Sequence, residues 1–392
     1  MKRILIVSSV FRPEPVVSAR ISEELAIALS EDFKVDVLAP FPSRPKGINY
    51  SQSDLVGYGY NRIIADSYVY PESKFLGRMK ESFSFGWATF RHIRKNKDYS
   101  IVYANTKPLF GVYFTLMACR ICKIPLVLHI QDIYPESMFG RLRTMQVFIK
   151  VFILIDRFFY GYARKILVIS ENMKNYLSET RKIPGEKFLV VRNWQNLEYS
   201  SIVNNQANKT FTFMFAGSIS PAAGVDFLID SFVKASLSNA KLIIAGDGSM
   251  KSYCQEIVKK SGTDNIFFIS LKPDEVTEVQ KQADVLLLPL KKGVGKTASP
   301  SKLSAYMMSE KPIIACVDAG CDTEYVIHTA KCGIVTEAEH CEGLISAMKK
   351  MMNLSSEELL QMGINGRLFA QKEMSKECNL KKIVNLIKSI VK

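Results

Sequence analysis

Short apolar segments alternate with longer segments of helical period along most of the chain, and this alternation restricts the fold more than any other feature. In the first half the apolar segments are nearly uninterrupted, at residues 3–8, 35–39, 101–104, 126–130, 166–169 and 188–191. Strands that are covered on both faces have this composition. Segments of helical period lie between them, at 21–29, 109–122 and 145–163. The pattern predicts a parallel sheet with crossover helices.

A polar stretch rich in Asn and Ser, residues 193–209, interrupts the pattern, which then restarts. New apolar segments follow at 212–216, 242–245, 266–269, 285–289, 313–316 and 333–335. We therefore predict an α/β protein with two Rossmann-like, doubly wound domains that face a cleft, and 392 residues suffice for both cores. The predicted N-terminal domain covers residues 1–195, the linker 196–210 and the second domain 211–372. A C-terminal helix at 373–392 is predicted to pack back on the N-terminal domain.

A net charge of +14 calls for an anionic partner. Nucleic acid is disfavoured, because the sequence has no zinc finger, helix-turn-helix or RNP-type motif. A phosphorylated small molecule and an anionic membrane surface remain. Basic and aromatic residues are mixed at 74–97 and 138–165, and charges interrupt the second stretch, so it does not span a bilayer. The spacing is typical of an interfacial helix, and equally of a core helix with a solvated face.

Eight cysteines include one Cys-x-x-Cys pair, Cys119 and Cys122, without a second pair at zinc spacing. They are predicted to be reduced, buried thiols. The first three residues, Met-Lys-Arg, run directly into the first apolar segment without a signal-peptide pattern. The predicted location is cytoplasmic, with peripheral contact at the cytoplasmic face of the inner membrane.

Ligands of open α/β sheets bind beyond the carboxyl ends of the strands. In the second half the residues directly after the first three strands are ligand-site candidates: Gly217, Ser218, Gly246, Asp247, Ser270 and Leu271. A structural turn explains the glycines around Asp247 equally well.

A fourth strand end leads to residues 299–303, Ser-Pro-Ser-Lys-Leu, where Pro300 suits the first turn of a helix. A lysine in that turn opposes the helix dipole unless an anion is bound there. This predicts a diphosphate held by Lys302 with Ser301, Leu303 and the free amides, and Lys296 lies one loop away.

In the first half, candidate residues that could face the cleft follow three strands: Glu14, Arg20, Asn105, Lys107 and Gln131. For the proline-rich loop after the first strand, a plain connection is the alternative. Asp132 and Glu136 lie four residues apart and could supply a general base for an acceptor hydroxyl. His129, in the preceding strand, is expected to be a hydrogen-bonded core histidine.

In order and spacing, the segments 105–110, 131–137, 300–303, 306–307 and 311–315 resemble the retaining glycosyltransferases of family 4, which have the GT-B fold. The branch they resemble builds bacterial capsule and O-antigen repeat units, as the N-acetylfucosamine transferases do. The resemblance covers essentially the whole chain. It implies that the candidate residues of the first domain bind an acceptor and that those of the second domain bind a nucleotide-sugar donor, with UDP preferred. It implies neither a metal nor a further cofactor. The sequence agrees in having no Asp-x-Asp motif after a strand.

The chain departs from this family at phosphate- and ribose-binding positions. Ser218 and Ala223 stand where many members have Arg and Lys, and Lys296 and Ser304 stand at the paired glutamates. Lys296 could replace a lost phosphate contact.

Together these features predict transfer of a HexNAc or deoxysugar, with retention, to a lipid-linked or saccharide acceptor in cell-surface polysaccharide synthesis. The predicted catalytic residues are Asp132, Glu136 and Lys302. A sugar-nucleotide epimerase on the same fold and an inactive scaffold of a polysaccharide assembly complex are the alternatives.

Overall fold

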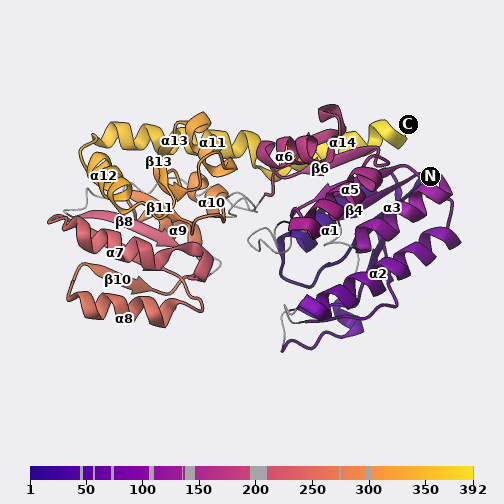
Figure 1. Ribbon diagram of the computed structural model, residues 1–392, viewed down its shortest axis with the longest axis horizontal. Coiled ribbons are helices and arrows are strands. Elements are labelled where there is room, and N and C mark those ends of the chain that lie inside the picture. The colour runs from indigo at the N-terminus through magenta and orange to yellow at the C-terminus, as the bar shows by residue number, and fades with distance from the viewer. Residues whose placement is uncertain are drawn as a thin grey trace. The chain divides into compact units, whose positions relative to one another are not determined.

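The computed structural model describes the chain except for residues 45–46, 56–57, 72–74, 106–109, 135, 137–145, 195–209, 273–274, 296–301 and 392 (Figure 1). It divides into two compact units, each with its own core. Unit 1 comprises Met1–Asn193 and Asn379–Lys392, and unit 2 comprises Trp194–Cys378. The sequence placed the first boundary at residue 195 and the start of the returning helix at 373. Most of the predicted linker lies outside the described residues.

Unit 1 contains a seven-stranded sheet whose neighbours all pair in parallel, in the order β3-β2-β1-β4-β5-β6-β7. The strands are β1 Arg3–Ser8, β2 Lys34–Ala39, β3 Asn61–Ile64, β4 Ile101–Asn105, β5 Leu126–Ile130, β6 Lys165–Val168 and β7 Phe188–Val190. The central strands are buried along their length, as their apolar composition predicts. The strand β3 was not predicted from the sequence; it is a short edge strand with an exposed asparagine at its start.

Helices cover both faces of this sheet. They are α1 Val17–Ser30, α2 Phe75–Lys95, α3 Phe110–Cys122, α5 Gln146–Tyr160, α6 Glu171–Arg181 and α14 Lys376–Val391. One core cluster joins α2, α3, α5 and α6 to alternate strand residues such as Leu5 and Val7. On α14 the buried residues recur every four positions, at Asn379, Ile383, Ile387 and Val391.

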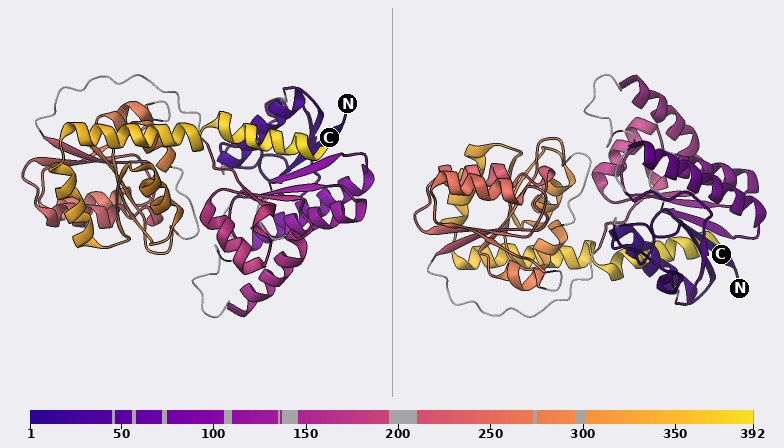
Figure 2. Two further views of the ribbon diagram at one scale, coloured as in Figure 1. Left: turned by 90° about the horizontal axis from the view of Figure 1, so that it is seen from above. Right: turned by 90° about the horizontal axis from the view of Figure 1, so that it is seen from below.

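The C-terminal helix is fixed to unit 1 by polar contacts as well as by its apolar stripe. The backbone amide of Arg192 donates to Asn379 Oδ1 at 3.0 Å. Lys388 pairs at 2.5 Å with Asp32, which follows α1, and Figure 2 shows α14 running beside that helix.

Unit 2 contains a six-stranded parallel sheet in the order β10-β9-β8-β11-β12-β13. The strands are β8 Phe211–Ala216, β9 Ala240–Ala245, β10 Ile266–Ile269, β11 Val285–Pro289, β12 Ile313–Val317 and β13 Gly333–Glu337. The helices are α7 Val225–Ala235, α8 Lys251–Ser261, α9 Val276–Lys281, α10 Lys302–Met308, α11 Asp322–Ala330, α12 Cys341–Met352 and α13 Ser356–Glu373. All six strands expected from the sequence are present, and the structure confirms two Rossmann-like parallel sheets.

Both sheets reverse their strand order once, between β1 and β4 in unit 1 and between β8 and β11 in unit 2. At such a switch point the loops leave the sheet in opposite directions, and ligands bind beyond the carboxyl ends of the two strands. Ligand sites are therefore expected beyond β8 and β11, and beyond β1 and β4.

Candidate donor and acceptor sites

Lys302 of α10 lies at the switch point of unit 2, against the end of β8. Its ammonium donates to the carbonyl oxygen of Ser218 at 3.1 Å and lies 4.0 Å from the centre of the Phe215 ring. Gly217 adopts a φ of +140°, and a Cβ there would lie 2.4 Å from Lys302 Cε. The structure thus brings together Gly217, Ser218 and Lys302, three donor-site candidates from distant parts of the sequence.

A buried tyrosine fixes α10 against β8. Tyr306 Oη accepts a hydrogen bond from the amide of Ala216 at 2.8 Å and donates to its carbonyl at 3.0 Å. The side chain of Leu303 is 1% exposed and belongs to the core of unit 2. Leu303 can therefore offer a ligand only its backbone.

The electrostatic setting of Lys302 points to an anion. Its half-burial lowers the pKa to about 8, since the charged form has lost part of its hydration. Among the residues that the structure describes, no carboxylate lies within ion-pair distance of it. An aromatic face and one carbonyl oxygen are its observed partners.

The backbone amides at the end of β8 differ in availability. Gly217 donates to Ala245 at 2.8 Å and Ile219 donates to Asp247 at 2.8 Å, which extends the ladder between β8 and β9. The amide of Ser218, between them, donates no hydrogen bond within the described chain. Ser218 rather than Gly217 offers the free N–H at this strand end.

This extended ladder explains the glycine that follows β9. A Cβ on Gly246 would lie 2.1 Å from the carbonyl oxygen of Gly217. The next residue, Asp247, has an exposed carboxylate that accepts from the Gly248 amide at 2.7 Å and from Lys251 at 3.1 Å. The geometry accounts for Gly246 without a ligand.

Other donor-site candidates are farther away or undescribed. Ser270 is exposed and Leu271 half-buried, after the edge strand β10. Lys296 and Ser301 lie outside the described residues.

Asp318 was not among the residues predicted from the sequence. It follows β12 and organises the loop after β11. Its carboxylate accepts from the amide of Gly293 at 2.7 Å and from that of Gly295 at 3.0 Å. A carboxylate directly after an all-apolar strand was the available signal. Asp318 holds the chain that leads toward α10.

At the switch point of unit 1, two acceptor-site candidates make structural contacts. Buried Glu14 accepts from the amides of Ser43 at 2.8 Å and Arg44 at 3.0 Å, joining the loops after β1 and β2. Burial raises the pKa of this carboxyl.

Asn105, also buried, donates to Ser22 Oγ of α1 at 3.0 Å. Arg20 is half-buried, and burial lowers its pKa. Lys107 lies outside the described residues.

The strand end of β5 carries a hydrogen-bonded histidine, as expected. Buried His129 contacts the Gln131 amide nitrogen through Nε2 at 3.0 Å and the Tyr103 hydroxyl through Nδ1 at 2.5 Å. Because an amide NH₂ only donates, Nε2 accepts and the proton sits on Nδ1. Burial lowers the pKa of His129 to about 3, so the ring is neutral and Gln131 is held in place. Half-buried Asp132 follows directly.

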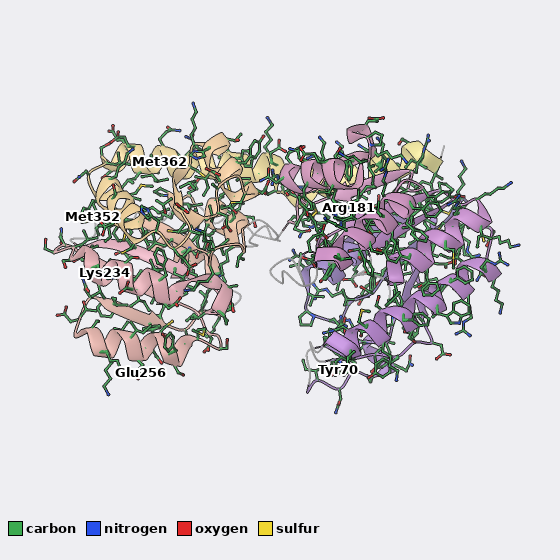
Figure 3. All side chains as sticks on the ribbon, in the orientation of Figure 1. Tyr70, Arg181, Lys234, Glu256, Met352 and Met362 are labelled. Carbon is green, nitrogen blue, oxygen red and sulfur yellow. The ribbon has the colours of Figure 1, made fainter. Side chains whose placement is uncertain are left out.

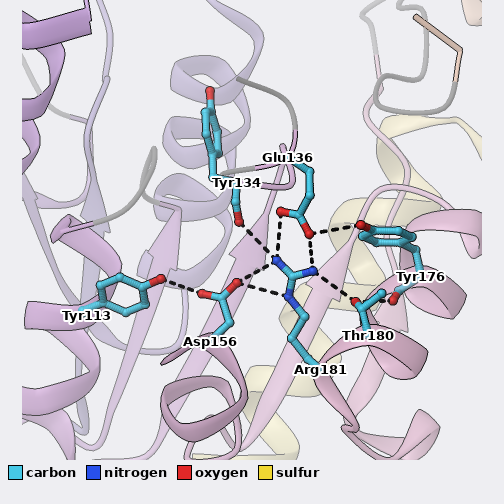
Figure 4. A network of polar contacts seen from close by, with 7 residues as sticks. All are labelled: Tyr113, Tyr134, Glu136, Asp156, Tyr176, Thr180 and Arg181. Carbon is cyan, nitrogen blue, oxygen red and sulfur yellow. Dashed lines mark hydrogen bonds and ion pairs between the residues drawn. The ribbon is translucent and has the colours of Figure 1, made fainter. Parts of the chain in front are cut away.

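Glu136 is part of a buried ion-pair network centred on Arg181 of α6 (Figure 4). Both oxygens of Glu136 accept from the guanidinium, one of them at 3.0 Å, and Tyr176 donates to the same carboxylate at 3.1 Å. Arg181 also donates to Asp156 of α5 at 2.8 Å, and Tyr113 of α3 donates to the other oxygen of Asp156 at 2.7 Å.

This network favours a positioning role for Glu136 over a role as general base. Both oxygens of its carboxylate accept hydrogen bonds from the Arg181 guanidinium, so both are engaged in holding that side chain. Burial raises the pKa of Asp156 to about 6, so Asp156 is largely ionised at neutral pH and balances the charge of Arg181. Arg181 further donates to the carbonyl of Tyr134 at 3.2 Å, which ties the segment after β5 to α6.

Three further observations concern metal ligands, membrane-spanning helices and the cysteines. No group of three or more His, Cys, Asp or Glu side chains in the described part of the chain could hold a metal ion. No described helix is both long and apolar enough to cross a membrane. All eight cysteines, each within the described residues, are free thiols, and each is buried or half-buried.

Two family models match consecutive parts of the chain. Residues 18–199 match Glycosyltransferase Family 4, and residues 200–369 match Glycosyl transferases group 1. An uncharacterised glycosyltransferase of Methanocaldococcus jannaschii is 30% identical over 131 residues, which are 31% of this chain and 32% of that protein. The chain spans between 32% and 53% of the length of the curated relatives it matches.

Solved structures resemble the whole chain in fold. Anabaena HepE, in complex with UDP, has a TM-score of 0.71 at 15% identity, over 99% of this chain and 100% of its own. WaaG, a glycosyltransferase involved in lipopolysaccharide biosynthesis, has a TM-score of 0.62 at 16% identity, over 98% of this chain and 99% of its own. With family matches from residue 18 to residue 369 on two Rossmann-like sheets, the chain belongs to the GT-B-type glycosyltransferases as a family-4-like member.

Proposed function

We propose that this protein transfers a sugar from a nucleoside diphosphate, UDP by preference, to a lipid-linked or saccharide acceptor, with retention at the anomeric carbon. The observation that carries the proposal is Lys302, a half-buried cation at the switch point of unit 2 with no carboxylate partner among the described residues. A diphosphate there would supply the missing negative charge. The unused amide of Ser218 would donate to the same group.

The proposed reaction breaks the bond between the anomeric carbon and the diphosphate oxygen. Negative charge develops on that oxygen, where Lys302 and the Ser218 amide stabilise it. The acceptor oxygen bonds to the anomeric carbon on the face that the diphosphate leaves, and the acceptor hydroxyl passes its proton to the departing diphosphate oxygen. Asp132, directly after β5, is the proposed residue for orienting the acceptor or stabilising the cationic sugar. Because Lys302 supplies positive charge at the leaving group, the proposal includes no metal ion.

The proposed substrates follow from the comparisons and from the sequence. HepE was crystallised with UDP, which favours a uridine donor here by analogy of fold. The structural likeness to WaaG favours a role in bacterial surface polysaccharide synthesis. A HexNAc or deoxysugar as the transferred group follows from the sequence resemblance alone.

A thermal-shift panel of UDP-, GDP- and dTDP-sugars tests donor binding, and a transfer assay on the best donor tests chemistry. Lys302→Ala is expected to lose about 2–4 kcal/mol of transition-state stabilisation, as when one oxyanion donor is removed. Lys234→Ala is the matched control, since Lys234 is an exposed lysine of α7 that pairs with Asp230 (Figure 3). An effect of Lys302→Ala below about tenfold in kcat/KM, or one no larger than that of the control, contradicts the assignment.

The assay also separates the alternatives. Nuclear magnetic resonance of the product gives the anomeric configuration, and inversion refutes a retaining transfer. Conversion of the donor sugar without an acceptor indicates an epimerase. Failure of every nucleotide-sugar to shift the melting temperature indicates a scaffold.

A further inference from the structure

An exposed apolar stripe runs along α5 of unit 1. Val147, Val151, Leu154 and Phe158 are 73%, 49%, 63% and 61% exposed. Their spacing of four, three and four residues places them on one side of the helix. The opposite side holds buried Ile149, Asp156 and Tyr160. The stripe is therefore an outward surface that the core of unit 1 does not use.

The stripe belongs to a larger surface made by the outer sides of α2, α3 and α5. These helices cover one face of the sheet, and α3 contacts both neighbours. Tyr113 of α3 and Phe159 of α5 lie 5.0 Å apart between ring centres, and Phe83 of α2 lies 5.2 Å from Phe114 of α3. On α2, Leu76, Phe83 and Trp87 are exposed. We call this surface the basic–apolar face.

Its charge is of one sign. The exposed charged residues of the three helices are Lys80, Arg91, Arg94, Lys95, Arg120, Lys150 and Arg157. The guanidinium of Arg120 lies 4.9 Å from the centre of the Phe158 ring, so charge adjoins the apolar stripe directly.

The carboxylates of these helices are Glu81 and Asp156, and neither offsets the exposed charge. Glu81 pairs with Arg78 at 2.9 Å and with Arg44, and its side chain is largely buried. Asp156 is buried and paired with Arg181. No exposed carboxylate remains on the described parts of α2, α3 and α5.

We propose that the basic–apolar face docks on an anionic membrane surface. The apolar side chains would enter the boundary between headgroups and acyl chains, and the surrounding lysines and arginines would contact anionic headgroups. A second copy of the chain fits less well, because a symmetric contact would oppose two faces of equal positive charge. Nucleic acid would leave the aliphatic side chains Val147, Val151 and Leu154 without a partner. This membrane-docking proposal does not depend on the proposed sugar transfer.

Flotation with vesicles of phosphatidylcholine and phosphatidylglycerol, 70:30, against pure phosphatidylcholine tests it. The protein is expected to float with the anionic vesicles and to dissociate as salt is raised from 0.1 to 0.5 M. Lys150→Gln with Arg157→Gln is expected to weaken the partition coefficient by at least about tenfold, from the loss of two basic side chains. Leu154→Gln with Phe158→Gln is expected to weaken it to a similar degree.

Unit 2 offers matched controls for both changes. Leu360 and Leu368 of α13 are exposed to 49% and 53%, and Lys349 and Lys350 of α12 are exposed. Glutamine at either pair should leave flotation unchanged. Melting temperatures of all four variants show whether each is folded.

Three results overturn the proposal. They are equal binding to neutral and anionic vesicles, equal flotation of the α5 and control variants, and no flotation of the unaltered protein. A dimer in sedimentation velocity that the α5 substitutions dissociate, without vesicle binding, assigns the face to a second copy.

Discussion

Donor affinity should fall as pH rises through 8, because the group that is proposed to hold the diphosphate loses its charge there. Burial lowers the pKa of Lys302 to about 8 in the free protein. At pH 7 about nine-tenths of the molecules carry the ammonium, and at pH 9 about one-tenth do. A bound diphosphate raises the pKa, so the complex stays protonated across this range. The apparent affinity should therefore drop about tenfold between pH 7 and pH 9, about 1.4 kcal/mol.

Isothermal titration with UDP-glucose at pH 7, 8 and 9 and constant ionic strength measures this change. The diphosphate of this probe does not ionise in that range, but its uracil ring begins to lose a proton near pH 9, so the contribution of the lysine is the difference from a variant whose cation does not titrate. Lys302→Arg provides the internal comparison, because a guanidinium stays charged throughout and should give a flat profile. Lys234→Arg should keep the slope of the unaltered protein.

Two results would refute the reasoning. A flat affinity for the unaltered protein would mean that Lys302 does not meet the diphosphate or is not half-buried in solution. An unchanged slope in Lys302→Arg would mean that another group titrates.

Two further predictions concern stability. Gly246→Ala should destabilise unit 2 by more than about 2 kcal/mol in urea unfolding, since the added Cβ would meet a backbone oxygen at 2.1 Å. Gly262→Ala, at a φ of +69° with no atom within 4 Å, should cost only about 1 kcal/mol, and equal effects would contradict the steric argument. Arg181→Met should destabilise unit 1 by about 3–5 kcal/mol, because it leaves the carboxylates of Asp156 and Glu136 without their cation. Adding Asp156→Asn should recover part of that loss, and full additivity of the two changes would refute the pairing.

The fold was predictable because its signal is repeated and local. Strands buried on both faces need continuous apolar runs, and the central strands β11 and β12 of unit 2 follow that rule. The edge strand β3 escaped because it is short and only partly covered. The meeting of Gly217 with Lys302 was also predictable, since parallel strands deliver their carboxyl ends to one edge of the sheet.

Side-chain partners were not predictable in the same way. Glu136 and Arg181 are 45 residues apart, and they meet because α6, which packs on α5, β6 and β7, brings Arg181 to the segment after β5. The spacing of Asp132 and Glu136 suggested acid–base chemistry, whereas in the structure Glu136 forms an ion pair with the buried Arg181. Likewise the direction of the Leu303 side chain depends on how Tyr306 fixes α10, which no local pattern encodes.

The two switch points have the same strand order, and they differ in how their polar groups are used. In unit 1, two backbone amides occupy the carboxylate of Glu14, and the amide of Asn105 binds α1. In unit 2, Lys302 meets a carbonyl and a ring but no described carboxylate, and the Ser218 amide stays unused. Partial burial of a cation without a counter-charge costs solvation energy and adds nothing to the stability of the fold. An anionic ligand would supply that counter-charge, so the contrast in polar satisfaction, more than the shared fold, supports the proposal that the nucleotide-sugar binds unit 2.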